Sequence, residues 1–516
     1  MTAKTQAKAK SLKPVGVLTF FGMTVALVSS VRNIPDVAAT GWTMFFYMLV
    51  ATLLFALPIT LMSGEFAGMF PRAGGPELWV TNSLSPRWGF VTSWLLWVQM
   101  FPGMVMVASV VSPLVAVTIG DPHLGSNSMF TLICILVTYW TITILNLFFD
   151  MARIGGRIGV ILGLYLPVAF LVILGIVALF KVGIKADGYL GSGQITHDAV
   201  RTGSVGRLLV PFSSKSVSTL AFFSSIVFIY TGIEMSSVYI PRLKKPAKTY
   251  IRGIFMALIF MFSFNTLLAF VTADVIPLGT IDLNNIAQAP VIILKILGLP
   301  TWLGNVFAAS VLIGVIVQLS AWASGPSKTI TDSARRGLYP ARLRFWKTNQ
   351  FDIAPTVLLT QATVISFFAL IFILIPGVNN AFLLLVTATA IIYIVVYVLM
   401  AIGILRLRST KPTLKRTFHM GNTHLAWTVM VVFLITVLAS SIATLWYQGW
   451  TNAFIILAIT VVLSVAPLII YRIRKPSWLS DVTRELGEQD ADQEPTSQPS
   501  AQSSSQPVTA PPTPVR

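Results

Sequence analysis

The chain has 516 residues, of which 55% are hydrophobic and only 10% are charged. Its mean hydropathy is +0.80, which excludes a soluble globular domain of average composition and indicates a polytopic membrane protein. The formal net charge of +18 does not indicate a nucleic-acid partner. Lys and Arg concentrate in alternate loops, as the positive-inside rule predicts for a membrane protein.

Apolar stretches long enough to cross about 30 Å of hydrocarbon, roughly 20 helical residues each, recur along nearly the whole chain. The first is too long for the h-region of a cleavable signal peptide, so we expect it to stay in the membrane. The basic loops lie on one side, which predicts cytoplasmic termini and a place in the cell (inner) membrane. In chain order, we predict twelve transmembrane helices at residues 17–40, 44–66, 89–118, 127–149, 157–182, 217–240, 250–275, 303–324, 356–376, 380–405, 424–446 and 452–472.

These helices divide the chain into four parts. Residues 1–16 form a cytoplasmic N-terminal segment, and residues 17–405 form a ten-helix core. Residues 406–476 add two membrane helices outside that core. The Gln, Ser and Pro-rich composition of residues 477–516 predicts a disordered cytoplasmic tail.

The first and sixth predicted helices are interrupted at matching places. Residues 28–31 precede Pro35 in the first, and residues 230–234 precede Pro241 in the sixth. Paired interruptions in corresponding halves of a membrane protein indicate a transporter's binding site. Each half has five crossings, an odd number, so we expect the second half to be inverted relative to the first.

A helix break in a membrane frees backbone N–H and C=O groups, which are tolerated only inside protein or along a cavity. The half-helix that starts near Arg32 would direct N–H groups towards an anion, and the carbonyls that end the preceding half-helices could receive an ammonium. This geometry suits an amino acid zwitterion. In the alternative interpretation Ser29, Ser30 and Gly232 are ordinary small packing residues, but two matched breaks favour a site.

A series of short motifs follows the chain in order. It comprises Phe20-Phe21-Gly22-Met23-Thr24 with Thr40-Gly41, Pro58 and Glu65 with Gly74-Gly75 and Trp79, Pro86-Arg87-Trp88-Gly89-Phe90, Gly325-Pro326-Ser327, Asn379-Asn380 and Leu414-Lys415-Arg416-Thr417-Phe418. In order and spacing, the series resembles the amino acid-polyamine-organocation (APC) transporters, and especially their glutamate/GABA antiporter subfamily, over residues 14–475.

The resemblance implies an all-α integral membrane protein with a LeuT-like fold, in which two inverted five-helix repeats with broken helices 1 and 6 work by alternating access. It also implies a secondary active antiporter that exchanges an external amino acid such as glutamate for an internal decarboxylated amine such as GABA. Such exchange supports acid resistance when a cytosolic decarboxylase supplies the amine. The implied partners are amino acid and amine substrates, membrane lipid and, functionally, that decarboxylase.

The sequence departs from the glutamate/GABA antiporter pattern next to both breaks. Arg32-Asn33 follows the first break, and Pro241-Arg242 and Lys245-Pro246 follow the second. Three alternatives therefore stay open: exchange of another amino acid and amine pair, ion-coupled import of an amino acid, and a membrane scaffold that transports nothing.

Enzyme chemistry has little support in the sequence. The four histidines lie in loops or at a helix edge, and no HExxH, Walker A or nucleotide-binding Gly-rich motif occurs. We therefore predict no enzymatic activity, no metal site and no cofactor.

Several side chains near the breaks are candidates for substrate contact. Glu234 could contact an amine or clamp the broken sixth helix, and Arg32 could read an anionic side chain or form an outer gate. Tyr393 and Tyr397 are four residues apart, share one helix face and could close over a substrate. Glu65 is interpreted as a packing or inner-gate group instead. The candidate substrate-binding residues are Val28, Ser29, Ser30, Arg32, Asn33, Trp97, Tyr230, Thr231, Gly232, Glu234, Trp322, Tyr393 and Tyr397.

Overall fold

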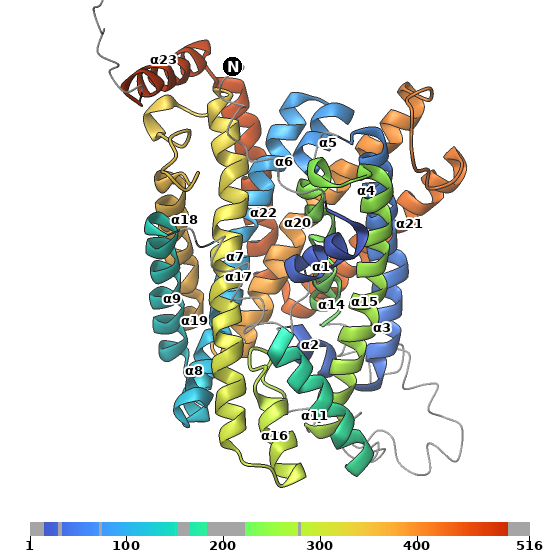
Figure 1. Ribbon diagram of the computed structural model, residues 1–516, viewed down its shortest axis with the longest axis vertical. Coiled ribbons are helices and arrows are strands. Elements are labelled where there is room, and N and C mark those ends of the chain that lie inside the picture. The colour runs from blue at the N-terminus through green and yellow to red at the C-terminus, as the bar shows by residue number, and fades with distance from the viewer. Residues whose placement is uncertain are drawn as a thin grey trace, which may run out of the picture.

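The structure is a computed structural model (Figure 1) that describes residues 15–28, 33–71, 75–149, 151, 165–182, 222–276 and 280–493. Within these ranges the chain is helical, apart from turns, loops and a single β-bridge between Val15 and Leu243. The loops rich in Lys and Arg gather at one end of the helices, at the top of Figure 1. We call it the basic end and define it by residues 242–248, 335–347, 406–416 and 472–475.

Nine helices of the described part are long and apolar enough to cross a membrane. They coincide with nine of the twelve predicted helices and differ from them mainly at their ends. The other three predictions, at residues 17–40, 157–182 and 217–240, contain shorter helices, and the first and last of these three are broken. The prediction of an all-α membrane protein with broken helices 1 and 6 is confirmed.

The first five crossings form one repeat, in which the first crossing is split and the second carries a π-helical turn. In chain order its elements are α1 (Val17–Val28), α2 (Ile34–Ala38), α3 (Met44–Val50), η3 (Ala51–Ala56), α4 (Leu57–Met69), α5 (Pro76–Ser83), α6 (Pro86–Val98), α7 (Met100–Ser109), α8 (Val111–Ile119), α9 (Ser128–Phe148) and α11 (Leu166–Val182).

The next five crossings form a second repeat, which also begins with a split helix. Its elements are α14 (Phe223–Ile229), η8 (Ile233–Arg242), α15 (Pro246–Val275), α16 (Gln288–Leu297), α17 (Trp302–Arg335), η9 (Ala341–Leu343), α18 (Pro355–Ala369), α19 (Ile371–Leu374) and α20 (Val378–Thr410).

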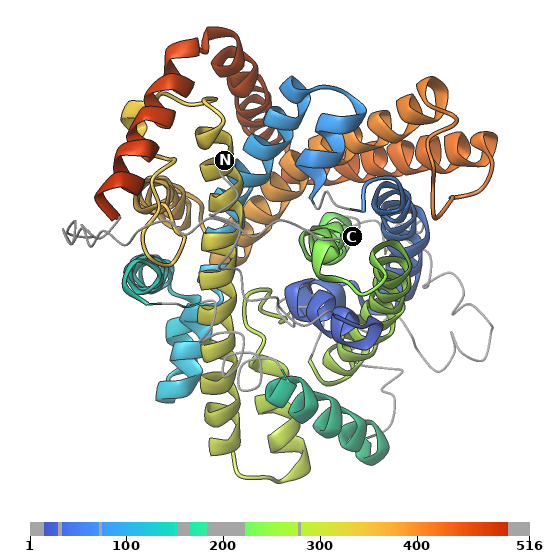
Figure 2. The same cartoon turned by 45° about the horizontal axis from the view of Figure 1, so that its top comes forward.

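Corresponding elements of the two repeats run in opposite directions (Figure 1). The short helix α5 follows the second crossing at the basic end, whereas α16 follows the seventh crossing at the opposite end. The contacts are paired in the same way, because α2 packs on α15 while its counterpart η8 packs on α4. Figure 2 brings the basic end forward and shows α1, in dark blue, beside α15, in green. The two repeats are therefore inverted, as predicted.

Two helices lie outside the repeats and pack on them. The helix α21 (Thr423–Gln448) contacts α20, and α22 (Trp450–Ile473) contacts α6. Pro467 lies inside α22 and has no N–H to donate to the carbonyl of Leu463, four residues earlier. The indole Nε1 of Trp94 in α6 donates to that carbonyl at 2.9 Å. A side chain of the core thus replaces the hydrogen bond that the proline removes.

This contact predicts a coupled effect of two substitutions. Trp94→Phe should lower the free energy of unfolding by about 1–3 kcal/mol, because it leaves the Leu463 carbonyl without a donor. Pro467→Ala restores a backbone N–H at position 467, so Trp94→Phe should cost less in that background. The melting temperatures of the parent, the two single variants and the double variant in detergent form a double-mutant cycle that measures the coupling. Additive effects would contradict the assignment.

The helix α23 (Pro476–Gln493) occupies the start of the segment that was predicted to be disordered. It packs on η9 and α17. Val482 is fully buried, and a Cβ at Gly337 would lie 2.7 Å from the Cβ of Leu479. The two apolar side chains are three residues apart and share one helix face, and the burial of Val482 together with the contact of Leu479 at Gly337 favours the helix. The disorder prediction is therefore corrected for residues 477–493, and residues 494–516 lie outside the described part.

Candidate functional site

The break in the sixth helix is centred on Gly232. The α-helix α14 ends at Ile229, and η8, a 3-10 helix, begins at Ile233. Gly232 lies between them with a φ of +90°, in the left-handed region, which glycine adopts without the steric penalty that a Cβ brings. The break therefore depends on Gly232, which the sequence analysis places in the second interruption.

Glu234 follows the break and is fully buried. Its Oε1 accepts a hydrogen bond from the Tyr393 hydroxyl at 2.7 Å, and its Oε2 accepts one from the Tyr397 hydroxyl at 3.0 Å. The Tyr397 hydroxyl also accepts the Gly232 N–H at 3.0 Å. The two rings are tilted against each other, with centroids 5.0 Å apart. We call Gly232, Glu234, Tyr393 and Tyr397 the Glu234 group.

The charge of Glu234 has no counterpart among the described side chains. The ion pairs formed by described residues do not include Glu234. Two phenol hydroxyls stabilise the carboxylate instead, and hydrogen bonds of this kind are stronger when the acceptor is ionised. A buried carboxylate without a cation is the kind of group that an ammonium can pair with.

The second crossing closes one side of this group. The Thr52 and Tyr230 hydroxyls are 2.7 Å apart, and the Phe55 ring meets the Tyr397 ring edge-on at a centroid distance of 5.6 Å. Thr52 and Phe55 lie in η3, the π-helical turn, and such turns are frequent at functional sites. The sequence analysis missed both residues, since no residue type marks a π-turn in an apolar run.

The break in the first helix lies beside the sixth. The helix α1 ends at Val28, and α2 begins at Ile34. The Asn33 Nδ2 donates to the carbonyl of Ser225 in α14 at 3.4 Å. The candidates Ser29, Ser30 and Arg32 lie outside the described residues.

Three other candidates lie in different surroundings. The Trp97 Nε1 donates to Gln361 Oε1 at 3.1 Å, and the same oxygen accepts the Ser327 hydroxyl at 3.1 Å. Trp97 is thus part of a buried network that joins α6, α17 and α18. Thr231 lies in the break beside Gly232, and its hydroxyl donates to the carbonyl of Val227 in α14 at 3.4 Å. Trp322 is half-buried in α17.

The sequence model of amino acid permeases matches residues 15–482. The chain belongs to the amino acid permease family. The permease is 29% identical to an uncharacterized transporter of Legionella pneumophila over 426 residues, which are 81% of the permease and 86% of that protein. It is 26% identical to a glutamate/gamma-aminobutyrate antiporter of Lactococcus lactis over 483 residues, 89% and 91% of the two chains. Membership of this family confirms that the chain is a transporter and not an enzyme.

Two further comparisons concern a second named antiporter and a solved structure of the same fold. A probable agmatine/putrescine antiporter of Lactococcus lactis is 24% identical to the permease over 429 residues, 81% and 85% of the two chains. A crystal structure of a manganese transporter of Eremococcus coleocola matches it with a TM-score of 0.52 at 11% identity and covers 91% of the permease and 95% of that chain. The two proteins share their fold, which agrees with the LeuT-like architecture implied by the motifs.

A second buried carboxyl lies at the basic end, in the short helix α5. The Gly75 N–H at the start of α5 donates to the Ser237 hydroxyl of η8 at 3.0 Å. Next to this contact, the Oε2 of Glu77 is buried and accepts no hydrogen bond from a described residue. Burial raises the pKa of Glu77 from 4.5 to about 7, although Arg336 favours the ionised form.

This shift predicts a pH-dependent stability. Because the pKa of Glu77 is higher in the folded state than its ordinary value of 4.5, its ionisation destabilises the fold as the pH rises from 4.5 through 7. Glu77→Gln should therefore raise the melting temperature by a few degrees at pH 8 and leave it unchanged near pH 4.5. Melting curves of both proteins between pH 4.5 and 8 measure the difference. An equal difference at all pH values would contradict the prediction.

Proposed function

We propose that the permease is an antiporter that exchanges an external amino acid for an internal decarboxylated amine, such as glutamate for GABA, by alternating access. Relatives along most of the chain bear the names glutamate/gamma-aminobutyrate antiporter and probable agmatine/putrescine antiporter. The two broken helices, which lie side by side, supply the kind of site that such carriers use.

The observation that carries the proposal is the environment of Glu234. This carboxylate is fully buried between two tyrosine hydroxyls and forms no ion pair with a described residue. An isolated buried charge is costly, and a cation that pairs with it recovers part of that cost. The amino acid and the amine both carry an ammonium, so both compete for Glu234 and the carrier exchanges one for the other.

The remaining candidate residues surround this position in the proposal. Asn33 and Tyr230 line the two breaks together with the Glu234 group. Val28, Ser29, Ser30, Arg32, Thr231 and Trp322 remain candidates for the carboxylate end of an amino acid. Trp97 is better explained as a support of the helices around the site, because its indole nitrogen is bonded to Gln361.

In the membrane, we place the basic end in the cytoplasm of the cell, in accordance with the positive-inside rule. Both termini then lie in the cytoplasm of the cell and the protein spans the inner membrane. A cytosolic decarboxylase could supply the exported amine, and the exchange would then remove one internal proton per cycle.

A second substrate pair has support from the residues beside the breaks. The chain has Arg32 and Asn33 after the first break, and Arg242 after the second. These residues depart from the glutamate/GABA antiporter pattern, and one relative is named a probable agmatine/putrescine antiporter. Another amino acid and amine pair is therefore the chief alternative to glutamate and GABA, followed by ion-coupled import.

A counterflow experiment tests these proposals. Purified permease in liposomes is preloaded with glutamate, GABA, ornithine, agmatine or putrescine, and uptake of labelled external amino acids is measured at acidic and neutral pH. Uptake that requires a matched internal substrate supports exchange and identifies the pair. Uptake into empty liposomes would overturn obligate exchange, and no uptake of any amino acid would contradict an amino acid substrate.

A further inference from the structure

Residues 411–420, between α20 and α21, form a strap along the last turns of α4. The backbone N–H and the hydroxyl of Thr417 approach the carbonyl of Gly68 at 3.5 and 3.3 Å. Phe418 covers the helix at two glycines, since a Cβ at Gly64 would lie 3.3 Å from the Phe418 ring and a Cβ at Gly68 would lie 3.1 Å from its backbone nitrogen. Two glycines four residues apart thus make room for the strap.

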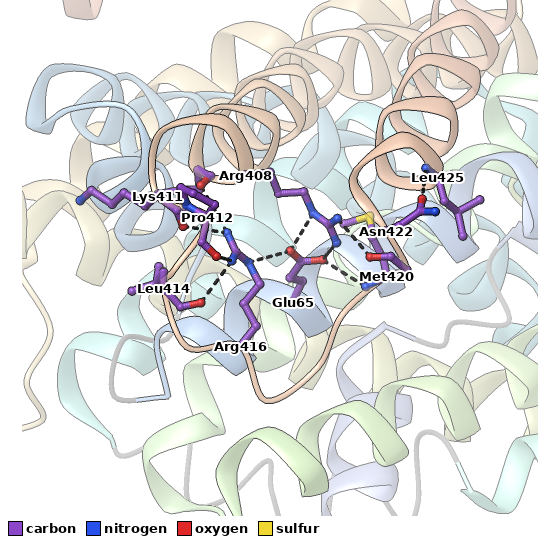
Figure 3. A network of polar contacts seen from close by, with 11 residues as sticks. Glu65, Arg408, Lys411, Pro412, Leu414, Arg416, Met420, Asn422 and Leu425 are labelled. Carbon is purple, nitrogen blue, oxygen red and sulfur yellow. Dashed lines mark hydrogen bonds and ion pairs between the residues drawn. The ribbon is translucent and has the colours of Figure 1, made fainter.

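Glu65 lies between these glycines and holds the strap through charge (Figure 3). Its Oε1 contacts Arg408 Nε at 2.9 Å and Arg416 Nε at 3.2 Å. Its Oε2 contacts Arg408 Nη2 and accepts the Met420 N–H at 3.1 Å. The side chains of Glu65, Arg408 and Arg416 are 0%, 5% and 6% exposed, so the three charges are desolvated together.

Arg416 ties the same strap to the end of α20. Its Nη2 donates to the carbonyls of Leu407 and Lys411 at 3.3 and 3.2 Å, and its Nη1 donates to those of Pro412 and Leu414 at 2.9 and 3.1 Å. The Leu407 carbonyl near the end of α20 already accepts the Lys411 N–H at 3.0 Å, so the guanidinium adds a second hydrogen bond there, and its positive charge favours the negative end of the helix dipole. One arginine therefore joins the end of α20 to Glu65 of α4.

The described hydrogen bonds that join the end of η8 to α5 and to the segment before α1 are neutral. The Val15 N–H donates to the Arg242 carbonyl at 2.9 Å, and the Lys244 N–H donates to the Val15 carbonyl at 3.1 Å. The Gly75 N–H donates to the Ser237 hydroxyl. Neutral hydrogen bonds are individually weak and exchange readily with water. Hydrogen bonds between ionised groups are stronger, and Glu65 makes several at once, so opening is easier at the neutral contacts.

From this difference we propose that the strap is a permanent joint, which keeps the basic ends of α4 and α20 together while the permease opens between α1, η8 and α5. Glu65, Arg408 and Arg416 are positioning residues of this joint. The inference rests on the proposed transport by alternating access, since it states which contacts stay closed during the cycle. It also refines the sequence-based interpretation of Glu65, in which packing and an inner gate were both open.

A disulfide across the joint tests the proposal. The single cysteine of the chain, Cys134, is first replaced by Ala. Gly68→Cys and Phe418→Cys are then combined, because a Cβ at Gly68 would lie 3.7 Å from the Phe418 Cβ, within the range that a disulfide spans. The oxidised pair should exchange substrate within about twofold of the reduced pair. Val15→Cys with Leu243→Cys, across the β-bridge, should stop exchange when oxidised and recover on reduction.

Loss of exchange on oxidation of the Gly68 and Phe418 pair, with recovery on reduction, would overturn the joint. If the Cys134→Ala parent exchanges no amino acid, the proposed function fails, and a second measurement still tests the joint. Met420 is 4% exposed beside Glu65, whereas His419 is exposed. In nanodiscs, Met420→Cys should resist maleimide with or without glutamate and GABA, while His419→Cys reacts. Labelling of Met420→Cys at the rate of His419→Cys would overturn the joint.

Discussion

Glu234→Gln is expected to lower the rate of exchange by about 10- to 100-fold, which corresponds to the loss of an interaction with a charged group of about 1.5–3 kcal/mol. The amide keeps the shape of the side chain but removes the charge that, in the proposed exchange, pairs with the substrate ammonium. One of its two polar ends also becomes a donor, which suits only one of the hydroxyls of Tyr393 and Tyr397. Initial rates of labelled uptake into liposomes loaded with the counter-substrate measure the effect.

A matched substitution separates this effect from a general loss of charge. Asp121 is exposed in the loop that follows α8, and α8 ends on the side opposite the basic end (Figure 1), so Asp121→Asn should leave the rate of exchange unchanged. The melting temperature distinguishes the two roles of Glu234. A slow variant with the melting temperature of the parent supports substrate contact. A variant that exchanges at the parental rate would rule substrate contact out, and a fall in both quantities would assign Glu234 to the helix clamp.

The breaks could be predicted because their determinants are local. Gly232 has a φ of +90°, a conformation that its residue type favours, and a polar residue follows within an otherwise apolar run. The pairing of Tyr393 with Tyr397 also follows from local periodicity, since residues four apart share a helix face. The contact of both hydroxyls with Glu234 depends on tertiary packing. It is still a reasonable expectation, because a buried carboxylate needs hydrogen-bond donors and the two phenols are donors in the same core.

Long-range partners could not be predicted in the same way. Glu65 binds Arg408 and Arg416, which lie more than 340 residues further along the chain. Nothing in the sequence around Glu65 or around these two arginines distinguishes them from the other basic residues of the loops. Trp97 illustrates a different limit. Its position well inside a predicted helix is compatible with a substrate contact. In the structure, however, its indole N–H donates to Gln361, a polar residue in a helix that lies far along the chain.

The short helix α23 shows how composition misleads at a boundary. Acidic, polar residues dominate the segment after Pro476 and predict disorder, but Val482 is fully buried and Leu479 contacts the folded core at Gly337. Helices in proteins owe most of their stability to such packing and not to the propensities of their residues. The surface that receives them lies more than 130 residues earlier in the sequence and is not visible in the segment itself.

Tyr397→Phe is expected to impair exchange more than Tyr393→Phe. Both substitutions keep the ring and remove one hydroxyl donor from Glu234. Only the Tyr397 hydroxyl also accepts the Gly232 N–H, so its removal leaves a buried donor and a buried acceptor unsatisfied, at about 1–3 kcal/mol each. We expect a fall of about 10- to 100-fold for Tyr397→Phe and about fivefold for Tyr393→Phe, measured as the initial rate of exchange.

The order of these two effects tests how the site is held together. If the tyrosines only surrounded the substrate, the two hydroxyls would be equivalent and their losses would be similar. The structure instead makes Tyr397 the link between the left-handed turn at Gly232 and the carboxylate two residues later. A larger effect of Tyr393→Phe would contradict this link. The predicted order would mean that α20 fixes the shape of the break, because the Tyr397 hydroxyl bonds both the backbone at Gly232 and the Glu234 carboxylate.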